Sequence, residues 1–378
     1  MPDMRFAPAP VLLARSRAGG LNQTSVRSHN ERLVLDLLRR EKTLSRFEIG
    51  QRTGLSAQTV SVLVRALLKD GLLTEEASSK GRVGPPTTPF SLNPDGAFAL
   101  GVYVGVKVID VCVLDFRGGL RGVLRRPIAP GDGLGAQVIA LAAEVLAAAP
   151  AMVRERCLGL GLGVNKAHWG EKPSRHDEGW TPEAGLDDIE NRLTTETGLP
   201  CFIVDDATSA AIGEILYGAG GGRFVYCHIG ANAQARVVLN GQAQVGFDDT
   251  LIALPGMSAL EARLAAASIP LGGFWMGEPL PEAAAPQLAE WGEDVTARIT
   301  DAIVGLLAFL DVPKTVIVAP LAAPHLERLA ARIDAAFHAR GVKVPTVIGH
   351  NAQWAKASGA AAAVMSSRFS QDWSVGEG

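Results

Sequence analysis

Residues 45–72, SRFEIGQRTGLSAQTVSVLVRALLKDGL, contain two helix starts and two helix ends in close succession. Ser45 followed by Glu48 is a capping-box pattern, and Gly54 supplies a tight turn after the short helix that this pair opens. Ser56 is a second N-cap candidate, and Gly71 is placed to end the helix that follows. Two short helices joined by a glycine-containing turn form a helix-turn-helix, which constrains the fold of this part of the chain.

The second of these helices has one apolar face, and its polar residues lie largely off that face. The apolar stripe consists of Val60, Leu63, Val64, Leu67 and Leu68. An earlier helix is predicted from Asn30 onward, within HNERLVLDLLRREK. Two strands near 72–76 and 87–92 would follow the helix pair as a wing, with a basic tip that suits a phosphate backbone.

The polar side of the second helix carries groups that read and hold DNA. A helix fits the major groove, where Gln58 can bond adenine bidentately and Thr59 can bond a base or a phosphate. Arginine and lysine side chains would neutralise phosphates. A merely solvated helix face is the alternative, but the turn, caps, stripe, wing and local charge all agree on DNA binding. The predicted DNA-binding residues are Ser45, Arg46, Ser56, Ala57, Gln58, Thr59, Ser61, Arg65, Lys69, Lys80 and Arg82.

Charge is distributed unevenly along the 378 residues, whose net charge is −3. Residues 1–92 carry 14 Lys and Arg against 8 Asp and Glu, so the remainder is acidic. A basic first quarter indicates that this end meets a polyanion. Residues 1–28 show no sustained periodicity and are predicted to be a mostly disordered arm. A homodimer or a larger even-numbered homo-oligomer would place two recognition helices on a palindromic double-stranded operator.

The four cysteines lie far apart in apolar runs without a CxxC pair, which indicates reduced core residues and a cytoplasmic protein. No apolar run approaches the roughly 18 residues of a membrane span. The arginine-containing N-terminus shows no apolar segment with a cleavage site, so no signal peptide is predicted. We therefore expect no membrane partner.

Beyond residue 93 the pattern changes to strands alternating with helices. Each half opens with strands and continues with alternating helices and strands, which favours two related α/β lobes. The predicted divisions are a disordered arm at 1–28, a winged helix-turn-helix domain at 29–93, a first lobe at 94–214, a second lobe with the oligomerisation region at 215–370, and a tail at 371–378.

Residues 201–214, CFIVDDATSAAIGE, run from an apolar strand through two aspartates into a small-residue helix. A carboxylate at the end of a buried strand can serve as a general base, which would make Asp206 catalytic. Alternatively Asp206 caps the helix, because its carboxylate would satisfy free N–H groups and suit the helix dipole. Binding of a small molecule is a third possibility, and the residues alone leave all three open.

Four segments occur in one order along the chain: the winged helix-turn-helix, a hairpin beginning ALGVYVG, the segment DDATSAAIGE and an alanine-rich helix ASGAAAAVM. This arrangement, over about residues 30–369, resembles the ROK family, which pairs sugar kinases with transcriptional repressors. The helix-turn-helix looks like that of the family's xylose-repressor-like branch. The resemblance implies a two-lobed actin-like, ribonuclease H-like fold after the winged domain, with Asp206 matching the general base of the kinases.

The kinase motifs that the resemblance implies are altered at each phosphate-holding position. Tyr103 and Val106 stand where the family's first strand carries Asp and a Gly-Gly-Thr turn. The family's second glycine-rich turn is replaced here by a segment that contains Gln234 and Arg236. The Glu-x-Gly-His motif and the cysteine-rich zinc segment have no counterpart, and Pro320 replaces a glycine turn after KTVIVA. Phosphoryl transfer depends on positioning phosphates, so we expect no catalytic residue, no metal and no cofactor.

A polar loop, NKAHWGEKPSRHDEGW, adds candidates for binding a ligand or a partner subunit. Trp180 in this loop can stack on a sugar ring, although such residues more often pack structurally, and the histidines of the loop lack the spacing of a metal site. The candidate ligand-binding residues are Asp205, Asp206, Asn165, His168 and Trp180.

The favoured hypothesis is a sequence-specific DNA-binding transcriptional regulator, acting as a repressor. Its catalytically inactive body would provide oligomer contacts and bind a small-molecule or protein effector. The alternative is a sugar kinase that phosphorylates its substrate through Asp206 and carries an accessory DNA-binding domain. A protein-interaction scaffold is a third hypothesis.

Overall fold

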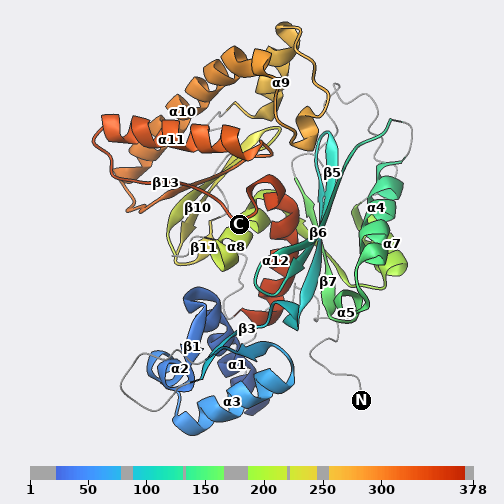
Figure 1. Ribbon diagram of the computed structural model, residues 1–378, viewed down its shortest axis with the longest axis vertical. Helices are drawn as coiled ribbons and strands as arrows, with labels where there is room; N and C mark the ends of the chain where they lie inside the picture. The colour runs from blue at the N-terminus through green and yellow to red at the C-terminus, as the bar shows by residue number, and fades with distance from the viewer. Residues whose placement is uncertain are drawn as a thin grey trace.

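The computed structural model describes residues 23–77, 88–130, 133–165, 186–218, 222–244 and 255–370. Within them the chain forms a small N-terminal unit with a three-stranded sheet and a body with two five-stranded sheets (Figure 1). Figure 1 shows the N-terminal unit, in blue, at one end of the molecule, and the helices of residues 257–339, in orange, at the other end.

The N-terminal unit is a winged helix-turn-helix, as predicted. Strand β3 lies between the other two strands and pairs antiparallel with both. The first helix begins at Gln23, so residues 23–28 of the predicted arm are helical, and β1 is a strand that the sequence pattern did not predict. The elements are α1 Gln23–Glu41, β1 Thr43–Ser45, α2 Arg46–Thr53, α3 Ala57–Lys69, β2 Leu73–Glu75 and β3 Pro89–Leu92.

The predicted helix ends of this unit are confirmed. Ser45 and Glu48 form a reciprocal capping box at the start of α2, and the Ser56 side chain accepts a hydrogen bond from a backbone N–H of α3. Gly54 and Gly71 have φ of 71° and 70°, in the left-handed region that favours glycine. These five residues therefore set the lengths of α2 and α3 and the turn between them.

The first sheet of the body has the strand order β6-β5-β4-β7-β8. Strands β4, β7 and β8 are parallel, so their carboxyl ends meet at one edge of the sheet. Helices α4 and α7 pack on one face around Val138 and Leu193. The elements are η1 Pro94–Gly96, β4 Phe98–Val104, β5 Val108–Asp115, β6 Leu120–Pro127, α4 Leu134–Ala148, α5 Ala151–Glu155, β7 Cys157–Val164, α7 Leu186–Thr197 and β8 Cys201–Asp205.

The second sheet has the order β11-β10-β9-β12-β13, and a turn at Asn240 and Gly241 joins β10 to β11 with positive φ at both residues. Helices α9, α10 and α11 cover one face of this sheet and form a core with it around the buried Trp291. The elements are β9 Phe224–Ile229, β10 Ala233–Leu239, β11 Gln242–Ala243, α9 Met257–Ala266, η3 Phe274–Met276, η4 Glu282–Ala284, α10 Ala285–Leu307, β12 Thr315–Val318, α11 Ala323–Ala339 and β13 Thr346–Ile348.

Helices α8 (Asp206–Tyr217) and α12 (Ala355–Phe369, preceded by η5 Ala352–Trp354) lie between the two sheets (Figure 1). Alanines of α8 pack on the second sheet. Helix α12 packs on the first sheet at Gly101 and Gly161, where a Cβ would stand 2.0 and 2.1 Å from helix carbonyl oxygens. Helix α12, which the predicted division places in the second lobe, thus packs on the first sheet, because two strand glycines let it approach closely.

The N-terminal unit shares a continuous apolar core with the body. Val34 of α1 belongs to the same buried cluster as Tyr217 at the end of α8 and Phe369 at the end of α12. The Arg156 guanidinium, after α5, donates hydrogen bonds to the carbonyl oxygens of Asp70 and Asp95, at 3.0 and 2.8 Å. Apolar packing and polar bonds therefore both hold the winged unit on the body.

Candidate nucleic-acid interface and the site at Asp206

Helix α3 separates its buried and exposed residues cleanly. Its inner face packs into the core of the winged unit through Val60, Leu63, Val64 and Leu67. Its outer face exposes Gln58, Arg65 and Lys69, which the sequence identified as base-reading or phosphate-binding residues. The helix thus presents a polar and basic outer face of the kind that enters a major groove.

The remaining predicted DNA-binding residues have varied environments. Ser56 and Ala57 are exposed at the start of α3, whereas Thr59 and Ser61 are half-buried. Arg46 is exposed, and its guanidinium lies over the Phe90 ring at 4.6 Å, which holds it at the start of α2.

Ser45 differs from these residues because it is buried. Its hydroxyl belongs to the capping box, where it accepts a hydrogen bond from the backbone N–H of Glu48 and lies 2.8 Å from the Glu48 carboxylate. This hydroxyl caps α2 itself, so the geometry favours a structural role for Ser45 over the predicted contact with DNA. Lys80 and Arg82, predicted at the wing tip, lie outside the described residues.

The two aspartates at the end of β8 divide the roles that the sequence left open. Asp205 is the N-cap of α8, and its carboxylate accepts a hydrogen bond from the Thr208 backbone N–H at 2.8 Å. Asp206 is the first residue of α8 and has no exposed surface. The interpretation of Asp206 as the cap is therefore wrong, because the preceding aspartate already fills that position.

The Asp206 carboxylate is bonded to a lysine of α12 instead. Lys356 Nζ lies 2.6 Å from Asp206 Oδ2, and the lysine side chain is 5% exposed. The same ammonium donates to Gln234 Oε1 at 2.8 Å and lies 3.4 Å from the Tyr103 hydroxyl, with the Tyr103 ring centre at 4.9 Å. The carboxylate thus faces a protonated amine from its own chain, and no open cleft.

The altered glycine-rich turn contributes the rest of this cluster. Gln234 and Arg236 extend from β10 and are both buried. Gln234 Nε2 lies 3.5 Å from Asp206 Oδ1, and the Arg236 guanidinium lies 3.4 Å from both Asp205 Oδ1 and Thr208 Oγ1. The side chains that the sequence identified as too large for a phosphate site therefore occupy the space beside the two aspartates.

Burial and charge together fix the protonation of the cluster. Burial opposes the charge on Lys356, but the Asp206 carboxylate outweighs it, so the pKa of Lys356 lies above its ordinary value. Burial raises the pKa of Tyr103, which stays a neutral phenol. His228 lies on β9, beside the strand that carries Gln234. Burial and the nearby Lys356 charge hold the pKa of His228 well below its usual range, so its imidazole is neutral.

A second buried ion pair joins the first sheet to the segment before α12. Both Nε and an Nη of Arg125 on β6 donate to the Asp110 carboxylate, at 2.6 and 2.7 Å. The same guanidinium donates to the Gln353 carbonyl oxygen at 2.8 Å and lies over the Trp354 ring at 4.6 Å. Neither Arg125 nor Lys356 is predicted from the sequence, although the single lysine in the alanine-rich segment AKASGAAAAVM is a signal for the latter.

The other predicted ligand-binding residues do not complete a site. Asn165 follows β7 directly and is half-buried at the sheet edge where Asp205 also lies. His168 and Trp180 lie outside the described residues. In the part of the chain that the structure describes, no three His, Cys, Asp or Glu side chains are grouped to hold a metal. The helices of that part include none with the length and apolar character to cross a membrane.

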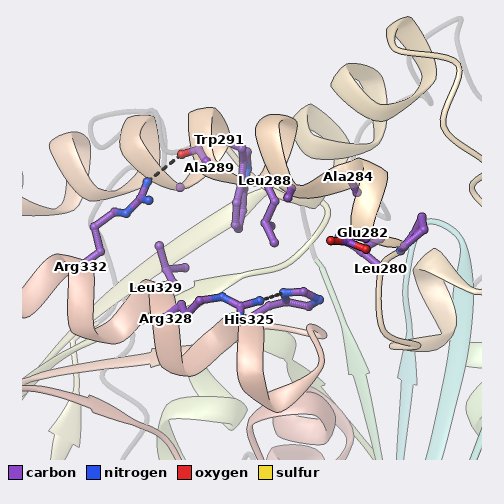
Figure 2. Close-up of a pocket in the computed structure, with 13 residues that line it drawn as sticks. Leu280, Glu282, Ala284, Leu288, Ala289, Trp291, His325, Arg328, Leu329 and Arg332 are labelled. Atoms are coloured by element: carbon purple, nitrogen blue, oxygen red, sulfur yellow. Dashed lines mark hydrogen bonds between the residues drawn. The ribbon is translucent and has the colours of Figure 1, made fainter.

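A cavity of about 390 Å³ lies on the outer side of the second sheet, between α10 and α11 (Figure 2). Figure 2 shows Leu288 and Leu329 extending into the space between the two helices, and His325 beside Arg328 at its edge. Arg332 donates to the Ala289 carbonyl oxygen at 2.7 Å and so bridges the helices. The cavity combines an apolar floor with the basic side chains of Arg328 and Arg332 and with the carboxylate of Glu282.

Comparison with known proteins supports a winged DNA-binding unit on this body. A sequence model of the MarR family matches residues 27–82. The uncharacterized protein y4fQ of Sinorhizobium fredii is 26% identical over 316 residues, which cover 77% of this chain and 78% of that protein. The putative xylose repressor of Caldicellulosiruptor sp. is 25% identical over 60% of this chain, and the xylose repressor of Bacillus subtilis is 23% identical over 58%. This chain spans 57% of the length of each of these two repressors.

Solved structures share the fold. The crystal structure of a ROK family transcriptional regulator, a homolog of the E. coli MLC protein, matches with a TM-score of 0.62 and 16% identity over 91% of this chain and 97% of its own. A ROK family glucokinase from Streptomyces griseus in complex with glucose and AMPPNP matches with a TM-score of 0.51 and 16% identity over 70% of this chain and 98% of its own. The predicted winged helix-turn-helix followed by a two-lobed actin-like fold is thus confirmed, and the relatives support the resemblance to the repressor branch of the ROK family.

Proposed function

We propose that this protein is a sequence-specific DNA-binding transcriptional repressor that acts in the cytoplasm as a homodimer or a larger even-numbered homo-oligomer. The observation that carries the proposal is the capped helix α3, whose outer face exposes Gln58, Arg65 and Lys69. Relatives that are named xylose repressors agree with this reading. Two such helices related by a two-fold axis would bind the two halves of a palindromic operator.

Genome-wide mapping of binding sites with the full chain tests this proposal. We expect one enriched palindromic sequence, and higher transcription of the adjacent genes when the protein is removed. Gln58→Ala should weaken binding to that sequence by roughly 5- to 150-fold, because a bidentate contact to adenine contributes about 1–3 kcal/mol. Gln242→Ala, a glutamine exposed on the body, is the matched control. Equal affinity of the Gln58 variant and the control for the operator would refute the assignment of α3.

We propose further that the body does not transfer phosphoryl groups. A general base must be able to take a proton from a bound hydroxyl, and the buried Asp206 carboxylate already holds the Lys356 ammonium at 2.6 Å. Buried Gln234 and Arg236 stand beside it, where a phosphate-binding turn needs open backbone N–H groups. The sugar-kinase alternative requires that these side chains leave the site together.

An assay of ATP turnover in the presence of hexoses and pentoses tests the second proposal. We expect no turnover above the background without protein. Sustained turnover that is lost in Asp206→Asn would show that the protein is a kinase. Turnover that persists in Asp206→Asn would indicate a contaminating enzyme.

For a small-molecule effector, we propose the cavity between α10 and α11 as the binding site. The site at Asp206 is occupied by side chains of the chain itself. In the cavity, burial and the neighbouring Arg328 charge lower the pKa of His325, so the neutral imidazole accepts a hydrogen bond from that guanidinium. An arginine beside an apolar floor suits a small organic anion with an apolar part.

Calorimetric titration with phenylacetate and with its uncharged analogue phenylacetamide tests this choice. We expect heat of binding with the anion alone, and none in Arg328→Gln. Titration with xylose should give no heat, since the Asp206 carboxylate is not free to accept a sugar hydroxyl. Binding of xylose that is abolished in Lys356→Met or Asp206→Asn would overturn this placement of the effector.

A further inference from the structure

The outer face of α3 contains one apolar residue among its polar ones. Gln58, Val62, Arg65 and Lys69 follow one another at intervals of four, three and four residues, the spacing of one helix face. All four are exposed, and Val62 is 54% exposed. Its side chain therefore lies one turn from Gln58 and one turn from Arg65, in the middle of the face that is proposed to enter the groove.

A single exposed valine is common on protein surfaces and by itself needs no explanation. Val62 is nevertheless unexpected at this position. A helix face exposed only to water would favour alanine, glutamine or lysine, which are better helix formers than valine. It also belongs to a face whose other members are polar or basic, so it does not extend the apolar stripe of Val60, Leu63 and Val64. The Val62 side chain therefore suits a partner whose surface has an apolar group among hydrogen-bonding groups.

The major groove presents one such group. The C5 methyl of thymine is the apolar feature on the base edges, and side-chain methyl groups contact it directly. Residues four apart on a helix are about 6 Å apart along its axis, while base pairs are about 3.4 Å apart. The base read by Val62 would thus lie one or two base pairs from the adenine read by Gln58.

We propose that Val62 is a specificity-determining residue, which selects a thymine through its methyl group within two base pairs of the position that Gln58 reads. The inference rests on the proposed function and deepens it, because it assigns A·T pairs to neighbouring positions of each half-site. The alternative occupant of this face is a second copy of the chain, whose contact would bury Val62 without DNA.

Selection from a random duplex library with the full chain gives the operator for the test. Each thymine is then replaced in turn by deoxyuridine, which removes only the methyl group, and dissociation constants are measured by fluorescence anisotropy. The affinity of the wild-type protein for the duplex should fall roughly four-fold when one particular thymine of a half-site is replaced, which is the effect of one buried methyl group. In Val62→Ala that loss should disappear, while the losses at other thymines stay unchanged.

Val123→Ala is the matched control, because Val123 is an exposed valine (43%) on β6 of the body. This variant should keep the wild-type sensitivity to deoxyuridine. If no replacement weakens wild-type binding, or if the sensitive thymine is the same in Val62→Ala, the proposal is wrong although the protein still binds its operator. A smaller molar mass of Val62→Ala than of the control in light scattering would assign the face to contact between chains. Failure to select any sequence would refute the proposed function itself.

Discussion

The ammonium of Lys356 lies 2.6 Å from the carboxylate of Asp206, and the two side chains are 5% and 0% exposed. The contact joins the first residue of α8 to the second residue of α12, the two helices between the sheets. A buried pair of this kind is costly to desolvate, and loss of one partner leaves an unpaired charge in the interior. The ion pair between Lys356 and Asp206 therefore has a structural role, because it joins α8 to α12 in the interior of the body.

Lys356→Met tests the importance of this bond. We expect the free energy of unfolding, measured by urea denaturation, to fall by about 3–5 kcal/mol, because the substitution leaves Asp206 charged and unpaired. Asp206→Asn combined with Lys356→Met should recover much of the loss. Arg52→Met, which breaks the exposed ion pair with Glu41, is the control and should cost less than about 1 kcal/mol. Equal losses in Lys356→Met and the control would contradict the structural role.

Gly161→Ala tests the close approach of α12 to the first sheet. The new Cβ would stand 2.1 Å from the Ala360 carbonyl oxygen, so the helix must shift. We expect a loss of about 1–3 kcal/mol or more in the same urea measurement. Gly122→Ala on β6 meets no atom within 4 Å and should leave stability unchanged or slightly raised. Similar midpoints for the two variants would show that α12 does not depend on the glycine.

The protonation of His228 should make the body sensitive to acid. Its pKa in the folded protein is well below the value of 6.5 for a free imidazole, first because of burial and then because of Lys356. Between those two values the unfolded chain binds a proton and the folded chain does not. This part of the stability is therefore complete above about pH 6.5 and is lost as the pH falls toward the folded pKa. Urea denaturation at a series of pH values should show a shallower loss in His228→Gln, and parallel curves for both proteins would refute the prediction.

Arg65 should contribute a salt-dependent part of the affinity. A phosphate contact releases counterions, so Arg65→Gln should reduce the slope of log K against log salt by roughly one for each bound chain. It should weaken binding to operator and unrelated DNA alike, whereas Gln58→Ala should act mainly on the operator. Arg340→Gln, at an exposed arginine paired with Asp301 on the body, is the control. An unchanged slope in Arg65→Gln would place α3 away from the phosphates.

The sequence predicted the winged unit well because its signals are local. The capping box at Ser45, the turn at Gly54 and the stripe that includes Val60 each act over a few residues, and each is found in the structure. The order of strands and helices in the body was also predictable from periodicity and from the resemblance to a known family.

The site at Asp206 was less predictable because its partners come from distant parts of the chain. The altered motifs correctly drew attention to Tyr103, Gln234 and Arg236, which do gather around the two aspartates. Lys356, which binds Asp206, lies 150 residues further along the chain. The alanine-rich sequence of its helix predicts burial but does not predict which residues the helix contacts. The packing of that helix on the first sheet depends on strand glycines, whose role appears only when both elements are placed.

The joint between the winged unit and the body has a consequence for operator architecture. Val34, Tyr217 and Phe369 belong to one continuous core, and Arg156 adds hydrogen bonds between the two parts. The winged unit is therefore held in one orientation on the body and is not joined to it by a linker alone. A rigid joint cannot follow a half-site that is rotated and displaced by an inserted base pair. In the proposed dimer, the way in which two bodies associate would therefore set the distance between the half-sites that the two winged units can bind.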